Sequence, residues 1–198
     1  LFNNAYIYHP YHWTPIGFMS DIQNQKIEDI KDFHSTYYQP KNAIVIVAGD
    51  IDENEVFANV EKHFKDIKNT KDIPSELHTV EPKQDGEKRV VINKESAVQM
   101  LAITYHIPNF EHEDQVALSA LSELLSSGKS SILQKKLVDE KRLVNTIYAY
   151  NMDLKDPGLF MFMAVANEGV DALKIEKEIL DTIAQIKQGQ FEEKDINK

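Results

Sequence analysis

The strongest constraint on the fold of this chain is a predicted hairpin between residues 143 and 166. Two runs, at 143–151 and 158–166, read as β-strands, and the turn residues Asp156, Pro157 and Gly158 separate them. Two strands joined by so short a connection run antiparallel. The hairpin therefore predicts an antiparallel sheet in this part of the chain.

Helices are predicted on both sides of this hairpin. Residues 113–126 have an apolar face, and further helices are expected at 130–140 and 170–187. A second strand pair is predicted at 88–93 and 97–107. Helices thus alternate with strand pairs rather than with single strands, which predicts an α+β fold with antiparallel sheets and helices packed on one face.

A similar but incomplete unit is predicted in the first third of the chain. Residues 26–38 and 55–67 have apolar residues at helical spacing, and the continuous apolar run at 42–51 reads as a buried strand. We therefore expect residues 1–67 to be the C-terminal part of a first α+β domain.

The stretch at 68–87 separates this part from the second domain. It is polar and aperiodic, and its prolines and glycine predict a linker. Residues 88–198 are then a second α+β domain. We expect this domain to be truncated at its C-terminus, because FEEKDINK at 191–198 reads as the start of another helix.

Charge and composition exclude several classes of protein. The net charge of −10 argues against nucleic-acid binding, which needs a basic face. The absence of cysteine excludes disulfides, thiolate nucleophiles and cysteine–zinc sites within this span. No apolar run approaches the length of a membrane helix. We therefore expect a soluble protein without a membrane partner, its compartment left open between cytoplasm and periplasm.

The stretch HPYHWTPIG at residues 9–17 holds two histidines, His9 and His12, that could suggest a zinc site. Helical zinc ligands lie at i and i+4 with a catalytic glutamate close by, whereas Pro10 interrupts this spacing and no carboxylate lies between the histidines. Neither HExxH nor HxxEH occurs in the chain. We therefore expect a rigid loop whose histidines cap backbone groups or pack.

The stretch SSGKSS at residues 126–131 resembles the end of a phosphate-binding loop. That loop requires a glycine where Glu123 stands, and it should follow a strand rather than a helix. We therefore expect a turn between two helices.

Paired carboxylates are expected at solvated helix starts, and no serine lies in a GxSxG elbow. These pairs are Glu53 with Glu55, Glu111 with Glu113, and Glu192 with Glu193. The sequence thus predicts no catalytic, cofactor-binding or metal-binding residue in this span.

The order of the motifs is more specific than any one of them. HPYHWTPIG, a helix ending in FHSTYYQP and then KNAIVIVAGDID are followed, after the linker, by GKSSILQKKLVDEKRLV and YAYNMDLKDPGLFMFMAVA. This succession resembles the pitrilysin/insulinase family of zinc metallopeptidases, which includes the mitochondrial processing peptidase. The resemblance implies two processing-peptidase-like α+β domains, the first of them partial.

The resemblance also implies where the functional residues of the family fall. Its HxxEH motif and third zinc ligand are expected upstream of HPYHWTPIG, before Leu1. Its substrate-positioning arginine and tyrosine would fall near Val138 and Asn145, where neither residue type is present. Arg142 and Tyr148 lie nearby in a different register, so no role is assigned to them.

The function implied by the resemblance is that of a zinc-dependent endopeptidase. Zinc is expected in the full-length protein and not in this span, which alone is expected to be inactive. The partners implied are a peptide substrate and a second half of the same family, as a homo- or heterodimer. Two interpretations stay open, namely part of the zinc-carrying half or a non-catalytic structural partner.

A third hypothesis is a peptide-binding module without hydrolysis. The predicted strand at 97–107, or that at 158–166, would then offer its edge to an extended peptide.

Overall fold

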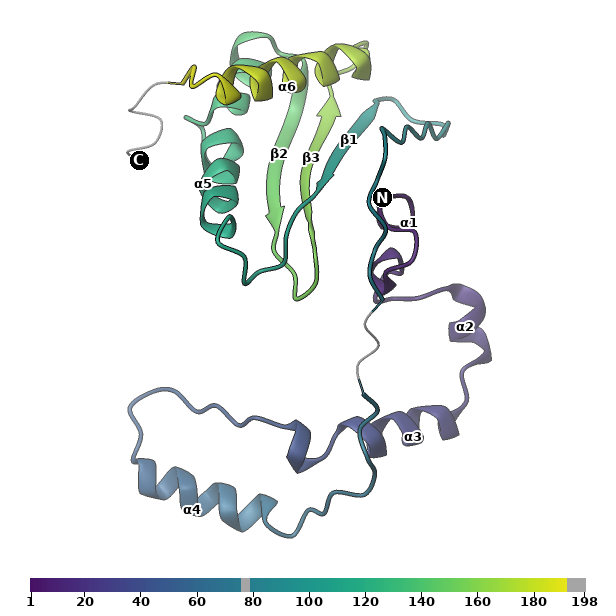
Figure 1. Cartoon of the computed structure of the whole chain (residues 1–198), viewed down its shortest axis with the longest axis vertical. Helices are drawn as coiled ribbons and strands as arrows, with labels where there is room; N and C mark the ends of the chain where they lie inside the picture. Colours follow the sequence, from purple (N-terminus) through teal and green to yellow (C-terminus); the bar gives the residue numbers. More distant parts are fainter. Residues whose placement is uncertain (76–78, 192–198) are drawn as a thin grey trace. The chain divides into compact units, whose positions relative to one another are not determined.

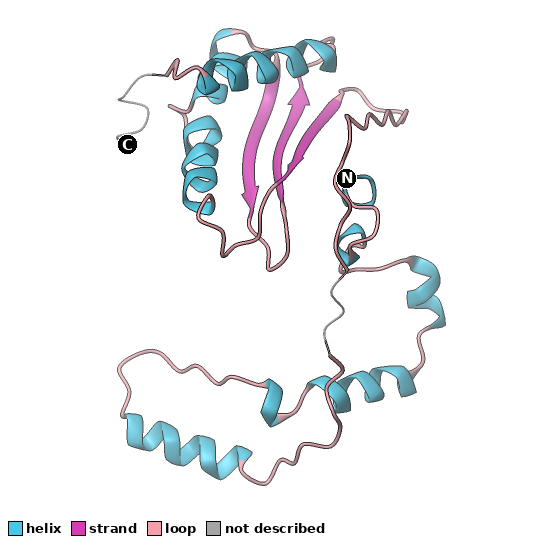
Figure 2. Cartoon of the chain, in the orientation of Figure 1, coloured by secondary structure: helices cyan, strands magenta, loops and turns pink. Residues whose placement is uncertain are grey.

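The structure, a computed structural model, describes residues 1–75 and 79–191. The chain divides into two compact units. The first unit is Phe2–Glu87, and the second unit is Lys88–Lys198 together with Leu1. Among the described residues, all strands belong to the second unit, whereas the first contains helices and loops (Figure 2).

The second unit is built on a three-stranded antiparallel sheet. Its strands are β1 (Met100–His106), β2 (Val144–Met152) and β3 (Leu159–Ala166), in the order β1-β3-β2. The predicted hairpin of β2 and β3 is confirmed. Its turn requires glycine at Gly158, because a Cβ there would lie 2.0 Å from the carbonyl oxygen of Met152.

Three helical segments cover one face of this sheet. They are α5 (Gln115–Ser126), the π-helix η3 (Gln134–Glu140) and α6 (Ala172–Lys187) (Figure 1). Alternation along the strands turns Ile147, Phe162 and Ala164 towards the helices. These side chains form a buried core with Leu125, Leu133, Leu137, Ile175 and Ile179. The predicted helices and the α+β fold class are confirmed.

The first unit consists of short helices. These are α1 (Phe2–Ala5), η1 (Pro10–His12), α2 (Met19–Asn24), α3 (Ile27–Tyr37), η2 (Pro40–Asn42) and α4 (Glu53–Phe64). The helices predicted at 26–38 and 55–67 correspond to α3 and α4. Asp52 caps α4 by accepting from the N–H groups of Asn54 and Glu55, so Glu53 and Glu55 stand in a first helical turn as expected.

The strand predicted at 42–51 is wrong. Residues 43–52 have no strand in the structure, and Ile44 and Ile46 are 88% and 84% exposed. A strand is stable only when neighbouring strands satisfy its backbone groups. None of the described residues of the first unit supplies such a neighbour. The apolar, β-branched composition indicated strand propensity but could not reveal whether a partner strand is available.

The strand predicted at 88–93 is also wrong, although its partner at 97–107 is confirmed as β1. Val91 and Ile92 are exposed, and no backbone ladder joins this segment to β1. Arg89 instead forms an ion pair with Glu176 of α6. The helix predicted to begin in 191–198 falls on residues 192–198, outside the described part of the chain.

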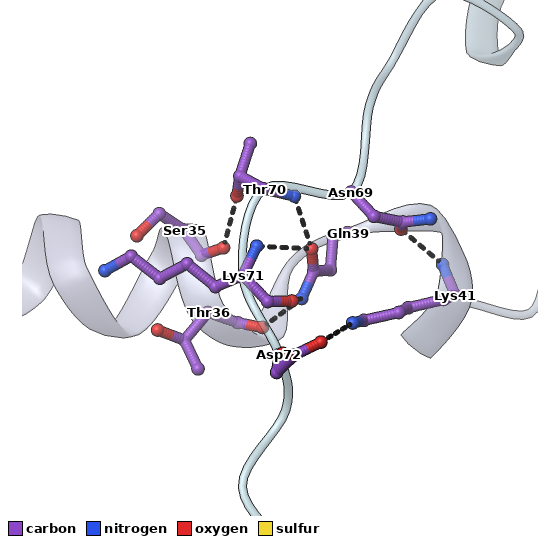
Figure 3. A network of polar contacts seen from close by, with 8 residues as sticks. All are labelled: Ser35, Thr36, Gln39, Lys41, Asn69, Thr70, Lys71 and Asp72. Carbon is purple, nitrogen blue, oxygen red and sulfur yellow. Dashed lines mark hydrogen bonds and ion pairs between the residues drawn. The ribbon is translucent and has the colours of Figure 1, made fainter.

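The segment predicted as a linker, 68–87, has no helix or strand where it is described, yet it is fastened to the first unit. Figure 3 shows the first attachment, in which the side-chain amide of Gln39 donates to the carbonyl oxygens of Thr36 and Lys71 at 2.6 and 2.8 Å. Its Oε1 accepts from the N–H of Thr70 at 2.8 Å. Because Gln39 is buried, these bonds hold residues 70–71 against the end of α3.

Candidate functional site

A groove of about 460 Å³ lies in the second unit between α5 and β2, two elements that run side by side in Figure 1. Its helical wall carries mainly serine hydroxyls and one carboxylate, Glu123. Its strand side is formed by residues 148–151 of β2, among which Tyr148 and Tyr150 are exposed and alternate with the core residue Ala149. The residues that line it include Ser119, Ser122, Glu123, Ser126, Tyr148, Ala149, Tyr150 and Asn151.

Ser126, at the end of α5, bonds to the backbone of β2 within this groove. The backbone N–H of Ala149 donates to the Oγ of Ser126 at 2.8 Å, and the Ser126 hydroxyl donates to the carbonyl oxygen of Ala149 at 3.0 Å. A single side chain at the end of α5 thus satisfies both backbone groups of a residue on β2.

A buried amide network lies beside this serine. The Nδ2 of Asn151 donates to Gln115 Oε1 and to Ser119 Oγ, both at 3.0 Å, while Gln115 Nε2 donates to the carbonyl oxygens of Pro108 and Asn109. The Oδ1 of Asn151 is buried without a hydrogen-bond partner in the described part of the chain. These contacts fix the start of α5 against the end of β2.

The groove offers hydroxyl groups and one carboxylate as hydrogen-bonding groups for a ligand. Ser119, Ser122 and Ser126 bond to backbone groups or to Asn151, and no histidine or lysine is among the residues that line the groove. These hydroxyls therefore lack the neighbouring imidazole or amine that commonly activates a serine nucleophile. The lining residues thus offer hydrogen-bonding groups to a ligand and contain no serine–histidine pair.

The histidine-containing loop is a tight turn in the first unit. His9 is buried, and its Nδ1 accepts from the N–H of Tyr11 at 3.2 Å. The Nδ1–H of His12 donates to the carbonyl oxygen of His9 at 2.8 Å. Both histidines therefore bond to backbone groups within a rigid turn, as the sequence predicted.

A carboxylate from far along the chain completes this turn. Glu81 accepts hydrogen bonds from the backbone N–H groups of residues 7, 8 and 9, at 2.6, 2.9 and 2.9 Å. Burial, followed by the proximity of Tyr11 and Glu81, raises the pKa of the neighbouring Tyr6 hydroxyl well above its ordinary value, so Tyr6 stays neutral. Glu81 is a second point at which the 68–87 segment is fastened to the first unit.

The described residues do not fit a zinc ion. Within residues 1–75 and 79–191, no three histidine, aspartate or glutamate side chains come together in a group that could hold a metal. In the histidine turn, the Nδ1 atoms of His9 and His12 are already bonded to the backbone. No step of metal chemistry can be derived from this donor set.

The family that the motif order indicated is decided by direct comparison. Residues 26–198 match the family model described as "Peptidase M16 inactive domain". The chain belongs to this family. The match confirms the resemblance to the pitrilysin/insulinase peptidases and includes residues of both structural units.

Relatives of this M16 inactive-domain chain are named as zinc proteases. The zinc protease PqqE of Helicobacter pylori is 50% identical over all of this chain, which covers 45% of that protein. A probable β-subunit of the mitochondrial-processing peptidase from Arabidopsis thaliana is 26% identical over 82% of the chain, which covers 32% of that subunit. The chain thus spans less than half the length of these relatives.

Solved structures confirm the fold. A protease from Helicobacter pylori superposes with a TM-score of 0.93 at 49% identity, over 98% of this chain and 48% of the protease. The peptidase M16 inactive domain from Pseudomonas fluorescens gives 0.82 at 19% identity, over 98% of this chain and 46% of the other.

Val138 and Asn145, near which the resemblance placed the family's arginine and tyrosine, lie outside the residues that line the groove. Val138 packs in η3 against the core, and Asn145 is exposed on β2. Arg142 lies in the turn after η3, and only Tyr148 reaches the groove wall. SSGKSS is a helix–helix turn as predicted, in which Gly128 has a positive φ of 72°.

The groove was not predicted from the sequence, which also suggested an exposed edge for a strand that has none in the described sheet. The predicted strand at 158–166 is β3, the central strand, so it has no edge to offer a peptide. The groove residues Ser126 and Ala149 are 23 positions apart. No local sequence motif identifies this pair of residues. The sequence did show a helix with several serines and an alternating strand, which are the two elements that form the groove.

Within the described ranges, none of the helices combines the length and apolar character needed to cross a bilayer.

Proposed function

We propose that this chain is the peptide-holding, non-hydrolytic part of a zinc-dependent endopeptidase that cleaves unfolded peptides. The observation that carries the proposal is the 50% identity, along the entire chain, with a protein named a zinc protease. The described residues contain no donor set for the metal. Zinc and the residues that hold it are therefore assigned to another part of the protein.

The proposal extends to the organisation of the chain. Residues 1–67 are the C-terminal part of one α+β peptidase domain, 68–87 connect it to the next, and 88–198 are a second such domain. The exposed apolar residues of 43–47 support this division, because they are suited to a sheet whose other strands the described residues lack. A second half of the same family, identical or different, would close over the peptide.

The experiment uses the complete protein that contains this chain and a fluorogenic unfolded peptide. The complete protein should cleave the peptide, lose activity when a chelator removes the metal, and regain it with added zinc. The present chain by itself should cleave nothing, with or without zinc. Cleavage by the chain alone would contradict the assignment of the hydrolytic residues to another part.

The alternative is a non-catalytic structural or peptide-binding partner of the same family. The description of the matching domain as inactive is the observation that favours this alternative. A complete protein that binds the peptide but does not cleave it in the presence of zinc would establish this alternative in place of the first.

A further inference from the structure

β2 is an outer strand of the described sheet, and its outward edge borders the groove. In an antiparallel sheet, every second residue of an outer strand directs its N–H and C=O away from the neighbouring strand. Ala149 is such a residue, because both groups bond to Ser126 at 2.8 and 3.0 Å. The residues two positions away, Ile147 and Asn151, face the same side.

An extended peptide that adds to a sheet edge would need these same backbone groups. The outward-facing residues of a strand recur about every 7 Å, and Ala149 lies between Ile147 and Asn151 on this edge. A peptide pairing with β2 would have to displace the Ser126 hydroxyl and break both of its bonds. At Asn151, the side chain is tied to Gln115 and Ser119 and holds α5 close to the strand.

We propose that Ser126 is a specificity-determining residue that closes the edge of β2 to extended peptide backbones. A peptide in this groove is then held through its side chains, by groups such as the Glu123 carboxylate, rather than by strand pairing. The inference rests on the proposed function, because it specifies how the chain holds a peptide.

The test compares two forms of one fluorescent unfolded peptide, about ten residues long, with free or alternately N-methylated backbone amides. Methylation removes the N–H groups that strand pairing needs. The protein is the complete one, as wild type or with Ser126→Ala, Ser126→Thr or Ser122→Ala. Ser122 is a matched control, since it lines the same groove from α5 and its hydroxyl donates to the carbonyl oxygen of Ser119 within the helix.

Wild type and Ser122→Ala should bind the two peptides equally. Ser126→Ala should bind the unmethylated peptide about fivefold more tightly and lose this gain on methylation, because the Ala149 groups become available for pairing. In the same variant, hydrogen exchange of the Ala149 amide should slow when the peptide is added. Ser126→Thr keeps the hydroxyl and should behave as wild type.

Two results would overturn the role of Ser126. One is a loss of wild-type binding on methylation, and the other is an absence of any gain in Ser126→Ala while exchange of the β3 amides shows the sheet intact. Wild type that binds neither peptide would instead count against the proposed function, and a gain in Ser126→Ala would still support the closing role.

Discussion

At the scale of single residues, Arg142 shows how the second unit tolerates local strain. Among the described residues it is the non-glycine residue with a positive φ, at 51°. Its carbonyl oxygen accepts from Asn167 Nδ2 at 2.8 Å, and the N–H of Leu143 donates to the carbonyl oxygen of Leu137 at 2.8 Å. These bonds hold the chain in a left-handed turn after η3, a conformation that costs a side-chain-bearing residue about 1 kcal/mol.

Arg142→Gly should therefore stabilise the second unit by about 0.5–1 kcal/mol, because glycine adopts this conformation without a steric penalty. The measurement is the free energy of unfolding in urea, followed through exchange of the β3 amides. Arg142→Ala is the control, since it removes the exposed guanidinium but keeps the strain, and it should give no gain. Equal stabilisation by both variants would show that the effect comes from the charge.

At the scale of elements, Glu178 of α6 joins this helix to η3. Its carboxylate forms ion pairs with Lys141 and, at 3.2 Å, with Lys136, and its side chain is only 15% exposed. Lys136 also donates to Thr182 Oγ1 at 2.8 Å. The hydrogen bond from Lys141, followed by that from Lys136, lowers the pKa of Glu178 in the folded chain.

This lowered pKa predicts how stability depends on pH. The contribution of Glu178 is fully present above its unfolded pKa and is lost as the pH falls through the folded pKa, because the unfolded chain then binds the proton more readily. Glu178→Gln should lower the free energy of unfolding by about 1–3 kcal/mol at neutral pH, and by less in acid. Glu168→Gln, an exposed carboxylate just before α6, should change little at either pH. A loss in Glu178→Gln that is equal at both pH values would contradict the ion pair.

The elements also show why sequence predicted some parts of the fold and not others. The β2–β3 hairpin and α6 were predictable because turn, strand alternation and helical period all lie in consecutive residues. The apolar run at 42–51 has the same local character as a strand, but pairing depends on residues elsewhere in the chain. The contact of Ser126 with Ala149 depends on how α5 lies along β2, which no local pattern specifies.

At the scale of the whole molecule, the chain belongs to a peptidase family, and its described residues contain no group of side chains that could hold a metal ion. The family match spans both units, yet the chain covers 45% of the H. pylori zinc protease to which it is similar. The histidines that first suggested a metal site support a turn, which Glu81 fastens to a segment more than 70 residues away. The order of the motifs thus indicated the family correctly, whereas the two histidines of the candidate metal motif only stabilise a local turn.

This arrangement makes a direct prediction about zinc. After incubation with zinc and dialysis, the present chain should retain far less than one tightly bound ion. The Nδ1 atoms of His9 and His12 bond to backbone groups, and among the described residues no third ligand joins them. Elemental analysis with a protein assay gives the ratio, and the complete protein is the positive control. One tight zinc per chain would place ligands within this span. His12→Ala would then show whether the turn holds it, since that variant should lose the ion while keeping the second unit folded.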